Sequence, residues 1–116
     1  MSKRKGLRTQ RKCVQYYLDE GWTVEVVERT HKFAKIKDLF NLFDILAIKE
    51  RGESEPIVAF IQVKTNQPAT QKRYKEWATK YCSDNIWCIV QTWYDHKGWI
   101  IQRYLPDETI VKKDLR

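Results

Sequence analysis

The chain has 116 residues, a net charge of +7, 42% hydrophobic and 13% aromatic residues, which fits one folded domain and excludes intrinsic disorder. No apolar run approaches the roughly 20 residues of a membrane helix, and the basic N-terminus is not followed by the apolar segment of a signal peptide. We therefore expect one domain, residues 1–116, that works in the cytoplasm or at the nucleoid and has no membrane partner.

The first third of the chain predicts a helix followed by a strand. Residues 1–6 are expected to form a basic, flexible arm, and a helix is predicted over Leu7–Glu20. The expected buried stripe of this helix consists of Cys13, Val14, Tyr17 and Leu18. Gly21 is expected at the helix C-cap, and Trp22–Glu28 alternates like a strand. Residues 29–40 form a long, polar and basic connection without clear periodicity.

The centre of the chain predicts a hairpin that is covered on both faces. Its two strands, Leu42–Ile48 and Pro56–Lys64, are almost continuously apolar and are joined by a polar turn. A helix is predicted next, over 69–83. The expected core-facing stripe of this helix consists of Tyr74, Trp77, Ala78 and Tyr81.

A final hairpin is predicted from Ile86–Trp93 and Trp99–Leu105, around a turn that contains Gly98. Residues 107–116 are expected to form a polar tail. The order of elements is therefore α-β-β-β-α-β-β, in which the second helix returns the chain to a further strand. This order predicts an α/β fold, with a mixed sheet flanked by helices.

Basic residues cluster in three runs, at the N-terminus, in the connection before the central hairpin, and on the helix after it. Together with a pI near 9.4, this pattern favours binding to the phosphate backbone of a nucleic acid, although any one run would also fit a solvated surface. The residues expected to contact phosphates are Arg4, Lys5, Arg8, Arg11, Lys32, Lys35 and Lys37.

The chain contains three cysteines, Cys13, Cys82 and Cys88. Their number is odd and no two of them have CxxC spacing, so they fit neither a disulfide framework nor a zinc site. We expect them to be small core residues in a reducing compartment.

Three polar residues interrupt the apolar central hairpin: Asp44 in its first strand, and Gln62 and Lys64 near the end of its second. Residues two apart in a strand share a face, so Gln62 and Lys64 point to the same side. If Asp44 also faces that side, a carboxylate, an amide oxygen and an ammonium group converge. A buried carboxylate needs a partner or a metal. Two interpretations follow, a core ion pair between Asp44 and Lys64 or the centre of a metal-dependent nuclease.

Asp44, followed by a hairpin and by Gln62-Val63-Lys64, resembles the motif of the PD-(D/E)xK nuclease superfamily. The chain is most similar to Holliday junction resolvases of the archaeal type. The run Lys5–Arg11 matches the basic segment with which that family opens, and Gly21-Trp22 matches its step into the first strand. The resemblance covers residues 4–65 in motif and the whole chain in element order.

The resemblance implies a restriction-endonuclease-like core and a small, basic homodimer that cuts four-way DNA junctions with Mg²⁺ or Mn²⁺, in a prokaryotic or phage-infected cell. The implied metal ligands are Asp44, the side-chain oxygen of Gln62 and the backbone carbonyl of Val63. Lys64 would orient the attacking water or hold charge that develops on the phosphate. The family's helix glutamate aligns with Gln10, and its strand acid aligns with Gln62.

These two glutamines offer oxygen without negative charge, so other carboxylates are candidates for the missing ligand. Asp38 precedes Asp44 by six residues and would fit either that role or a turn cap. Glu28, at the end of the first predicted strand, is a second candidate, and His31 would fit a base, a phosphate contact or a solvated loop residue.

Three functions are therefore consistent with the sequence. The first is a structure-selective, metal-dependent DNA endonuclease that resolves four-way junctions. The second is a nucleic-acid-binding protein on the same fold, whose nuclease site is weakened or inactive. The third is a nonspecific or restriction-type nuclease with the same residues.

Overall fold

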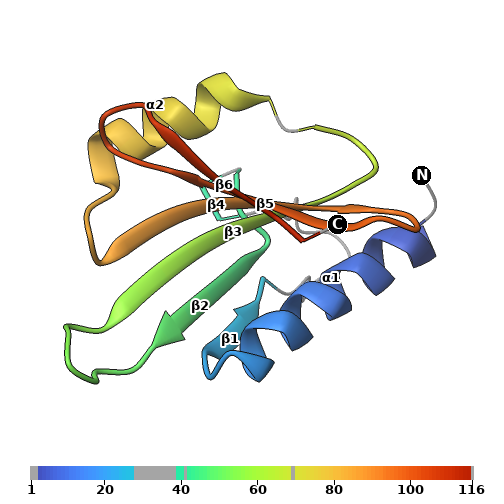
Figure 1. The fold of residues 1–116 in the computed structure, drawn as a ribbon, viewed down its shortest axis with the longest axis horizontal. Helices are drawn as coiled ribbons and strands as arrows, with labels where there is room; N and C mark the ends of the chain where they lie inside the picture. Colours follow the sequence, from blue (N-terminus) through green and yellow to red (C-terminus); the bar gives the residue numbers. More distant parts are fainter. Residues whose placement is uncertain (1–2, 28–38, 41, 69, 116) are drawn as a thin grey trace, which may run out of the picture.

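The computed structural model describes residues 3–27, 39–40, 42–68 and 70–115. Within these residues, six strands form one sheet and two helices lie on its opposite faces (Figure 1). In chain order, the elements are α1 (Lys3–Asp19), β1 (Thr23–Val26), β2 (Ile45–Lys49), β3 (Ile57–Thr65), α2 (Gln71–Tyr81), β4 (Ile86–Tyr94), β5 (Gly98–Tyr104) and β6 (Ile110–Asp114).

The strands lie in the sheet in the order in which they occur in the chain. β1, β2 and β3 are antiparallel neighbours, as are β4, β5 and β6, whereas β3 and β4 are parallel. A parallel pair needs a crossover connection, and α2 provides it. The predicted mixed sheet with flanking helices is confirmed.

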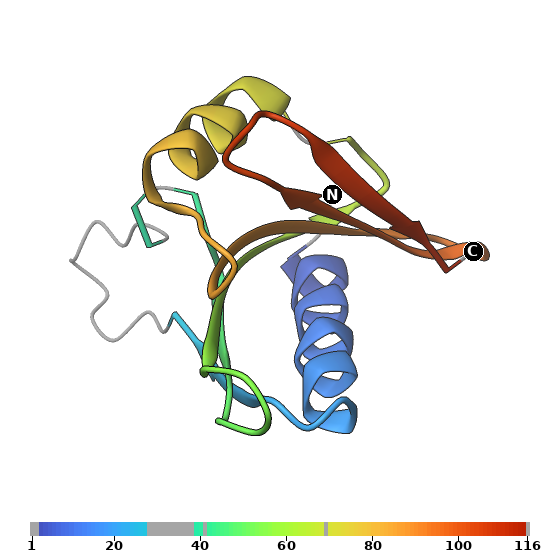
Figure 2. The same cartoon turned by 60° about the vertical axis from the view of Figure 1, so that its left-hand side comes forward.

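Two buried clusters fill the space between the helices and the sheet. The cluster under α1 includes Cys13 and Tyr17, together with Ile45 and Ile61. The cluster under α2 includes Phe43, Tyr74, Ala78, Val90 and Tyr104. Figure 2 shows the two helices on opposite sides of the curved sheet. Neighbouring residues of each central strand therefore point into different clusters.

Several predicted details are confirmed. Gly21 has a φ of +87° and its N–H donates to the Leu18 carbonyl at 3.0 Å, as expected after a helix C-terminus. Cys13 and Cys88 are fully buried, and all three cysteines are free thiols. Trp22 is buried while Thr23 is exposed, in line with the predicted alternation. None of the described helices is long and apolar enough to cross a membrane.

Two expectations for the chain ends are wrong. Residues 3–6 of the predicted flexible arm belong to α1, which begins at Lys3. A single glycine costs a helix only about 1 kcal/mol relative to alanine, so Gly6 does not set its start. The predicted polar tail contains β6, which pairs with β5 along the edge of the sheet. An edge strand makes hydrogen bonds on one side and tolerates charged residues such as Lys112, so apolar patterning does not reveal it.

The buried stripe predicted for each helix includes one residue that is exposed in the structure. Leu18 is 47% exposed and Tyr81 is 55% exposed, whereas Tyr17 and Ala78 are buried. Each helix contacts the sheet through a narrow face, so one flanking residue of the periodic pattern stays in solvent.

The first central strand also begins later than predicted, at Ile45. Before it, the Leu39 and Phe43 backbones exchange hydrogen bonds of 2.9 and 3.0 Å, which close a tight turn. The rest of the predicted 29–40 connection lies outside the described residues.

Candidate active site

Two hydrogen bonds of Asp44 connect the residue before β2 to the second half of β3. The Asp44 N–H donates to the Ile61 carbonyl at 2.9 Å, and the Asp44 carboxylate accepts a hydrogen bond from the Val63 N–H at 3.1 Å. The ladder pairs Ile45 with Ile61, so Asp44 lies opposite Gln62. The carboxylate therefore lies directly beside the Gln62-Val63-Lys64 segment, held by a backbone donor.

Gln62 and Lys64 point toward the α2 side of the sheet, because their neighbour Ile61 lies in the cluster under α1. Both side chains are half-buried. The Gln62 Nε2 donates a long hydrogen bond of 3.4 Å to the Val63 carbonyl, while its Oε1 is buried without a partner among the described residues. Leaving a buried acceptor unsatisfied costs about 1–3 kcal/mol, so this oxygen would gain from a ligand.

The described part of the chain contains no ion pair between Asp44 and Lys64, and thus gives no support to the core ion-pair interpretation. It also contains no group of three or more histidine, cysteine or acidic side chains that would hold a metal. Any ion bound here by described residues would therefore depend on amide and carbonyl oxygens beside the single carboxylate of Asp44.

Two neutral groups, the Tyr74 phenol and the Cys13 thiol, feel the charge of this carboxylate. Burial, and to a smaller extent the charge of Asp44, raises the pKa of Tyr74 to about 12. The same two causes raise the pKa of the Cys13 thiol far above its ordinary value. The Tyr74 hydroxyl donates to the Leu42 carbonyl at 3.3 Å, which ties α2 to the turn before Asp44. Tyr74 and Cys13 therefore stay uncharged beside the carboxylate at neutral pH.

A buried pair of threonines fixes α1 to the end of β3. The Thr65 hydroxyl donates to the Thr9 hydroxyl at 3.0 Å, immediately after Lys64. Thr9, Cys13 and Tyr17 are four residues apart and form the face of α1 that packs on the sheet. Sequence reasoning missed this pair, although the spacing from Cys13 and Tyr17 was a usable signal.

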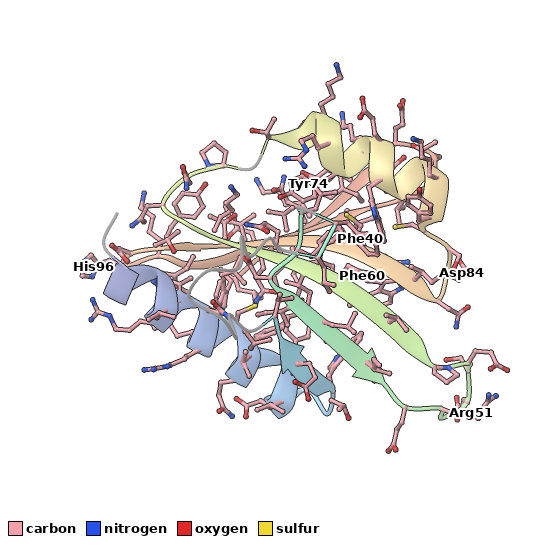
Figure 3. All side chains as sticks on the ribbon, turned by 180° about the vertical axis from the view of Figure 1, so that it is seen from behind. Phe40, Arg51, Phe60, Tyr74, Asp84 and His96 are labelled. Atoms are coloured by element: carbon pink, nitrogen blue, oxygen red, sulfur yellow. The ribbon has the colours of Figure 1, made fainter. Side chains whose placement is uncertain are left out.

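An aromatic wall borders the site on the α2 side. Phe43 packs edge-on against Trp77 at 5.0 Å and lies 5.6 Å from Phe60, which precedes Gln62 by two residues on the same face. Figure 3 shows Phe40, Phe60 and Tyr74 gathered beneath α2. A groove of about 460 Å³ lies along this wall, and it is lined by Phe40, Phe60, Trp77, Tyr81 and Ile86. This wall keeps the α2 side of the hairpin apolar up to Gln62.

The other predicted site residues are not joined to this centre by any hydrogen bond of the described residues. Gln10 is half-buried on α1 and lines a shallow depression with Arg11 and Val26. Asp38, Glu28 and His31 lie outside the described residues. His96 lies in the turn between β4 and β5, with a φ of +63° (Figure 3).

The predicted phosphate contacts are divided between α1 and the undescribed connection. Arg8 and Arg11 are exposed on α1, and Arg4 belongs to the same helix. Lys5 also belongs to α1. The remaining three, Lys32, Lys35 and Lys37, lie outside the described residues.

Among solved structures, the chain is similar to Archaeoglobus fulgidus Hjc, a Holliday junction resolvase from an archaeal hyperthermophile. The match has a TM-score of 0.53 and 14% sequence identity, and it covers 94% of this chain and 88% of that one. The chain has the fold of this resolvase. No family model and no curated protein matches the sequence. The likeness thus confirms the predicted fold, and the chemistry is argued from the residues of the site.

Proposed function

We propose that this protein is a metal-dependent DNA endonuclease of the junction-resolvase kind. The observation that carries the proposal is the Asp44 carboxylate, which is hydrogen-bonded to the Val63 N–H beside Gln62 and Lys64, on the fold of a resolvase. A nuclease of this class needs oxygen ligands and a cation at the end of this hairpin, and these residues supply both.

The donor set suits Mg²⁺ or Mn²⁺. Asp44 offers a carboxylate oxygen, Gln62 a buried Oε1 without a partner in the described chain, and Val63 a backbone carbonyl. Mg²⁺ prefers oxygen ligands and commonly takes one or two carboxylates together with water and substrate phosphate. When bound, the ion would lower the pKa of a water molecule and neutralise phosphate charge.

The chain itself would position and stabilise the reacting phosphate. The Val63 N–H fixes the orientation of the Asp44 carboxylate through a bond of 3.1 Å. Lys64 has no ion-pair partner within the described residues, so its ammonium group is available to the phosphate. There it would donate to a phosphoryl oxygen as negative charge develops.

DNA binding would use the basic face of α1 and the undescribed basic connection. Arg8 and Arg11 are exposed, and α1 carries no acidic residue in its first turn that would repel phosphates. A four-way junction presents two equivalent strands for cleavage, which a homodimer would match with two centres. Light scattering at several protein concentrations tests this dimer.

A binding protein with a silent nuclease centre is the second candidate. One specific observation favours it: within the described residues, Asp44 is the single acid at the site, because the aligned strand acid is Gln62. An amide provides an oxygen without charge, which weakens attraction for a divalent cation.

The deciding experiment compares cleavage of a labelled four-way junction and a matched linear duplex in Mg²⁺ or Mn²⁺, with Lys64→Ala as the control for contaminating nuclease. We expect junction-selective cutting that falls about 10²–10³-fold in Lys64→Ala, the typical loss of one transition-state donor. Equal, Lys64-dependent cutting of both DNAs would indicate a general nuclease. Tight binding without cutting in either metal would leave the binding protein.

A further inference from the structure

A cavity lined by both charged and apolar side chains lies on the α1 side of the sheet, on the face opposite to Gln62 and Lys64. It has a volume of about 290 Å³ and is lined by residues of α1, the end of β2, and β4, β5 and β6. β2 begins directly after Asp44 and ends at Lys49, which lines the cavity. Five strand residues span roughly 17 Å, so Lys49 lies at the far end of β2 from Asp44. The lining residue Ile89 pairs with Ile61, so the cavity extends toward the candidate centre on the opposite face of the sheet.

Three cations and two indole rings define this cavity. The cations are Lys49, Arg103 and Lys113, and Glu20 is the acidic residue that accompanies them. The rings of Trp22 and Trp87 lie 5.6 Å apart. The cavity wall is therefore net positive and carries flat apolar surfaces.

The Arg103 guanidinium is held in place by an indole ring. Its Cζ lies 4.0 Å from the centre of the Trp87 ring, and the Trp87 Nε1 is in turn fixed by a 2.8 Å hydrogen bond to the Asp84 carbonyl. Within the described residues, Arg103 makes no hydrogen bond and no ion pair, and its Nε is buried. Burial lowers the pKa of Arg103, although the group stays charged at neutral pH.

An unpaired, partly desolvated guanidinium stacked on an indole is pre-organised for an oxyanion. Little side-chain entropy is left to lose, and the planar fork suits two parallel bonds to a phosphate. Lys49 lies over the Trp22 ring at 5.7 Å. The register places Lys113 opposite Ile101, on the same face as Arg103.

We propose that this cavity binds a phosphate group, carried either by a free nucleotide or by a DNA strand. The three cations would hold the phosphate, and the indole rings would contact the apolar part of the nucleotide. The proposal does not depend on the nuclease activity, because none of these residues belongs to the Asp44–Lys64 centre.

The test is isothermal titration calorimetry of the full chain in EDTA, with inorganic phosphate, AMP and a blunt linear duplex as separate probes. The variants are Arg103→Gln and Lys113→Gln, and Lys112→Gln is the matched control. Lys112 pairs with Gln102 and so points to the other face of β6, while its replacement removes the same charge. Lys113 is exposed on an edge strand, so its variant tests the cavity even if Arg103→Gln perturbs folding.

At least one probe should bind about tenfold or more weakly to Arg103→Gln, several-fold more weakly to Lys113→Gln, and as tightly to Lys112→Gln as to the parent chain. A response with phosphate and AMP would assign a free nucleotide, and a response with the duplex alone would assign a strand phosphate. Equal affinities of all three variants for every probe, or no binding at all, would overturn the proposal. No cleavage is measured, so failure of the nuclease function would not affect the result.

Discussion

The two faces of β3 near its end differ in how their polar groups are satisfied. On the α1 side, the buried Thr65 hydroxyl donates to Thr9 at 3.0 Å. On the α2 side, Gln62 has a buried oxygen without a partner and Lys64 has no ion pair, within the described residues. A buried polar group that serves structure is normally paired, whereas unpaired groups concentrate at functional positions. Successive residues of one strand thus separate a structural role from a proposed chemical one.

The largest expected effect is on metal binding, in the variant Asp44→Asn. The amide oxygen can still accept the Val63 hydrogen bond, so the fold should persist while the negative charge is lost. Removing a residue that only hydrogen-bonds a metal ligand typically lowers metal affinity about 10–100-fold. Removing the ligand itself should therefore lower Mn²⁺ affinity at least about a hundredfold. Titration calorimetry with Mn²⁺ measures this loss.

Glu53→Gln is the control for Asp44→Asn, because it removes one negative charge from the exposed turn between β2 and β3. Its Mn²⁺ affinity should equal that of the parent chain. If Asp44→Asn and the parent gave the same heats, Asp44 would have no place in the metal site.

Gln62→Glu should act in the opposite direction. A carboxylate in place of the amide adds a charged oxygen next to Asp44, and we expect Mn²⁺ affinity and junction cleavage to rise about tenfold, which corresponds to about 1.4 kcal/mol. Titration calorimetry and the junction assay check this gain. If affinity fell instead, the Gln62 side chain would be serving the sheet and not the ion.

Thr65→Val should affect stability and leave the chemistry intact. Losing the hydrogen bond to Thr9 should lower the free energy of unfolding by about 1 kcal/mol, measured by urea denaturation. Thr23→Val, at an exposed strand position, should change it by less than about 0.5 kcal/mol. A stable Thr65→Val protein with lost cleavage would contradict the division between the two faces.

Much of the fold could be predicted because it depends on local patterns. Apolar runs gave the central hairpin, and the Gly21 signal gave the end of α1 correctly. β6 could not be predicted, since Lys112 and Lys113 hide an edge strand whose pairing depends on β5. The wrong burial of Leu18 and Tyr81 has a related cause, because helical periodicity does not say how wide the packed face is.

The candidate centre could be predicted in part for the same reason. Hairpin register brings Asp44 beside Gln62 and Val63 once the two strands are recognised. The Thr9–Thr65 pair depends on where α1 crosses β3, and the phosphate cavity depends on residues from five elements, among them Arg103. Helical spacing could place Thr9 on the packed face of α1, but no local pattern identifies which distant residue each of these side chains contacts.

The smallest expected effect concerns pH and the aromatic side of the sheet. Burial raises the Tyr74 pKa from about 10 to about 12, so folding favours the neutral phenol. The resulting stability is fully present below pH 10 and is lost as the pH rises through 12. Tyr74→Phe should therefore weaken the fall in the urea midpoint between about pH 10 and about pH 12.

Tyr74 is not the sole source of this loss of stability, because burial raises the pKa of Tyr104 to about 12 as well. Tyr74→Phe should accordingly remove part of the alkaline destabilisation, and Tyr104→Phe should remove a further part. If the urea midpoint fell equally with pH in the parent and in Tyr74→Phe, the Tyr74 phenol would not contribute to the alkaline destabilisation. The bond from Tyr74 to the Leu42 carbonyl would then act only to position the turn before Asp44.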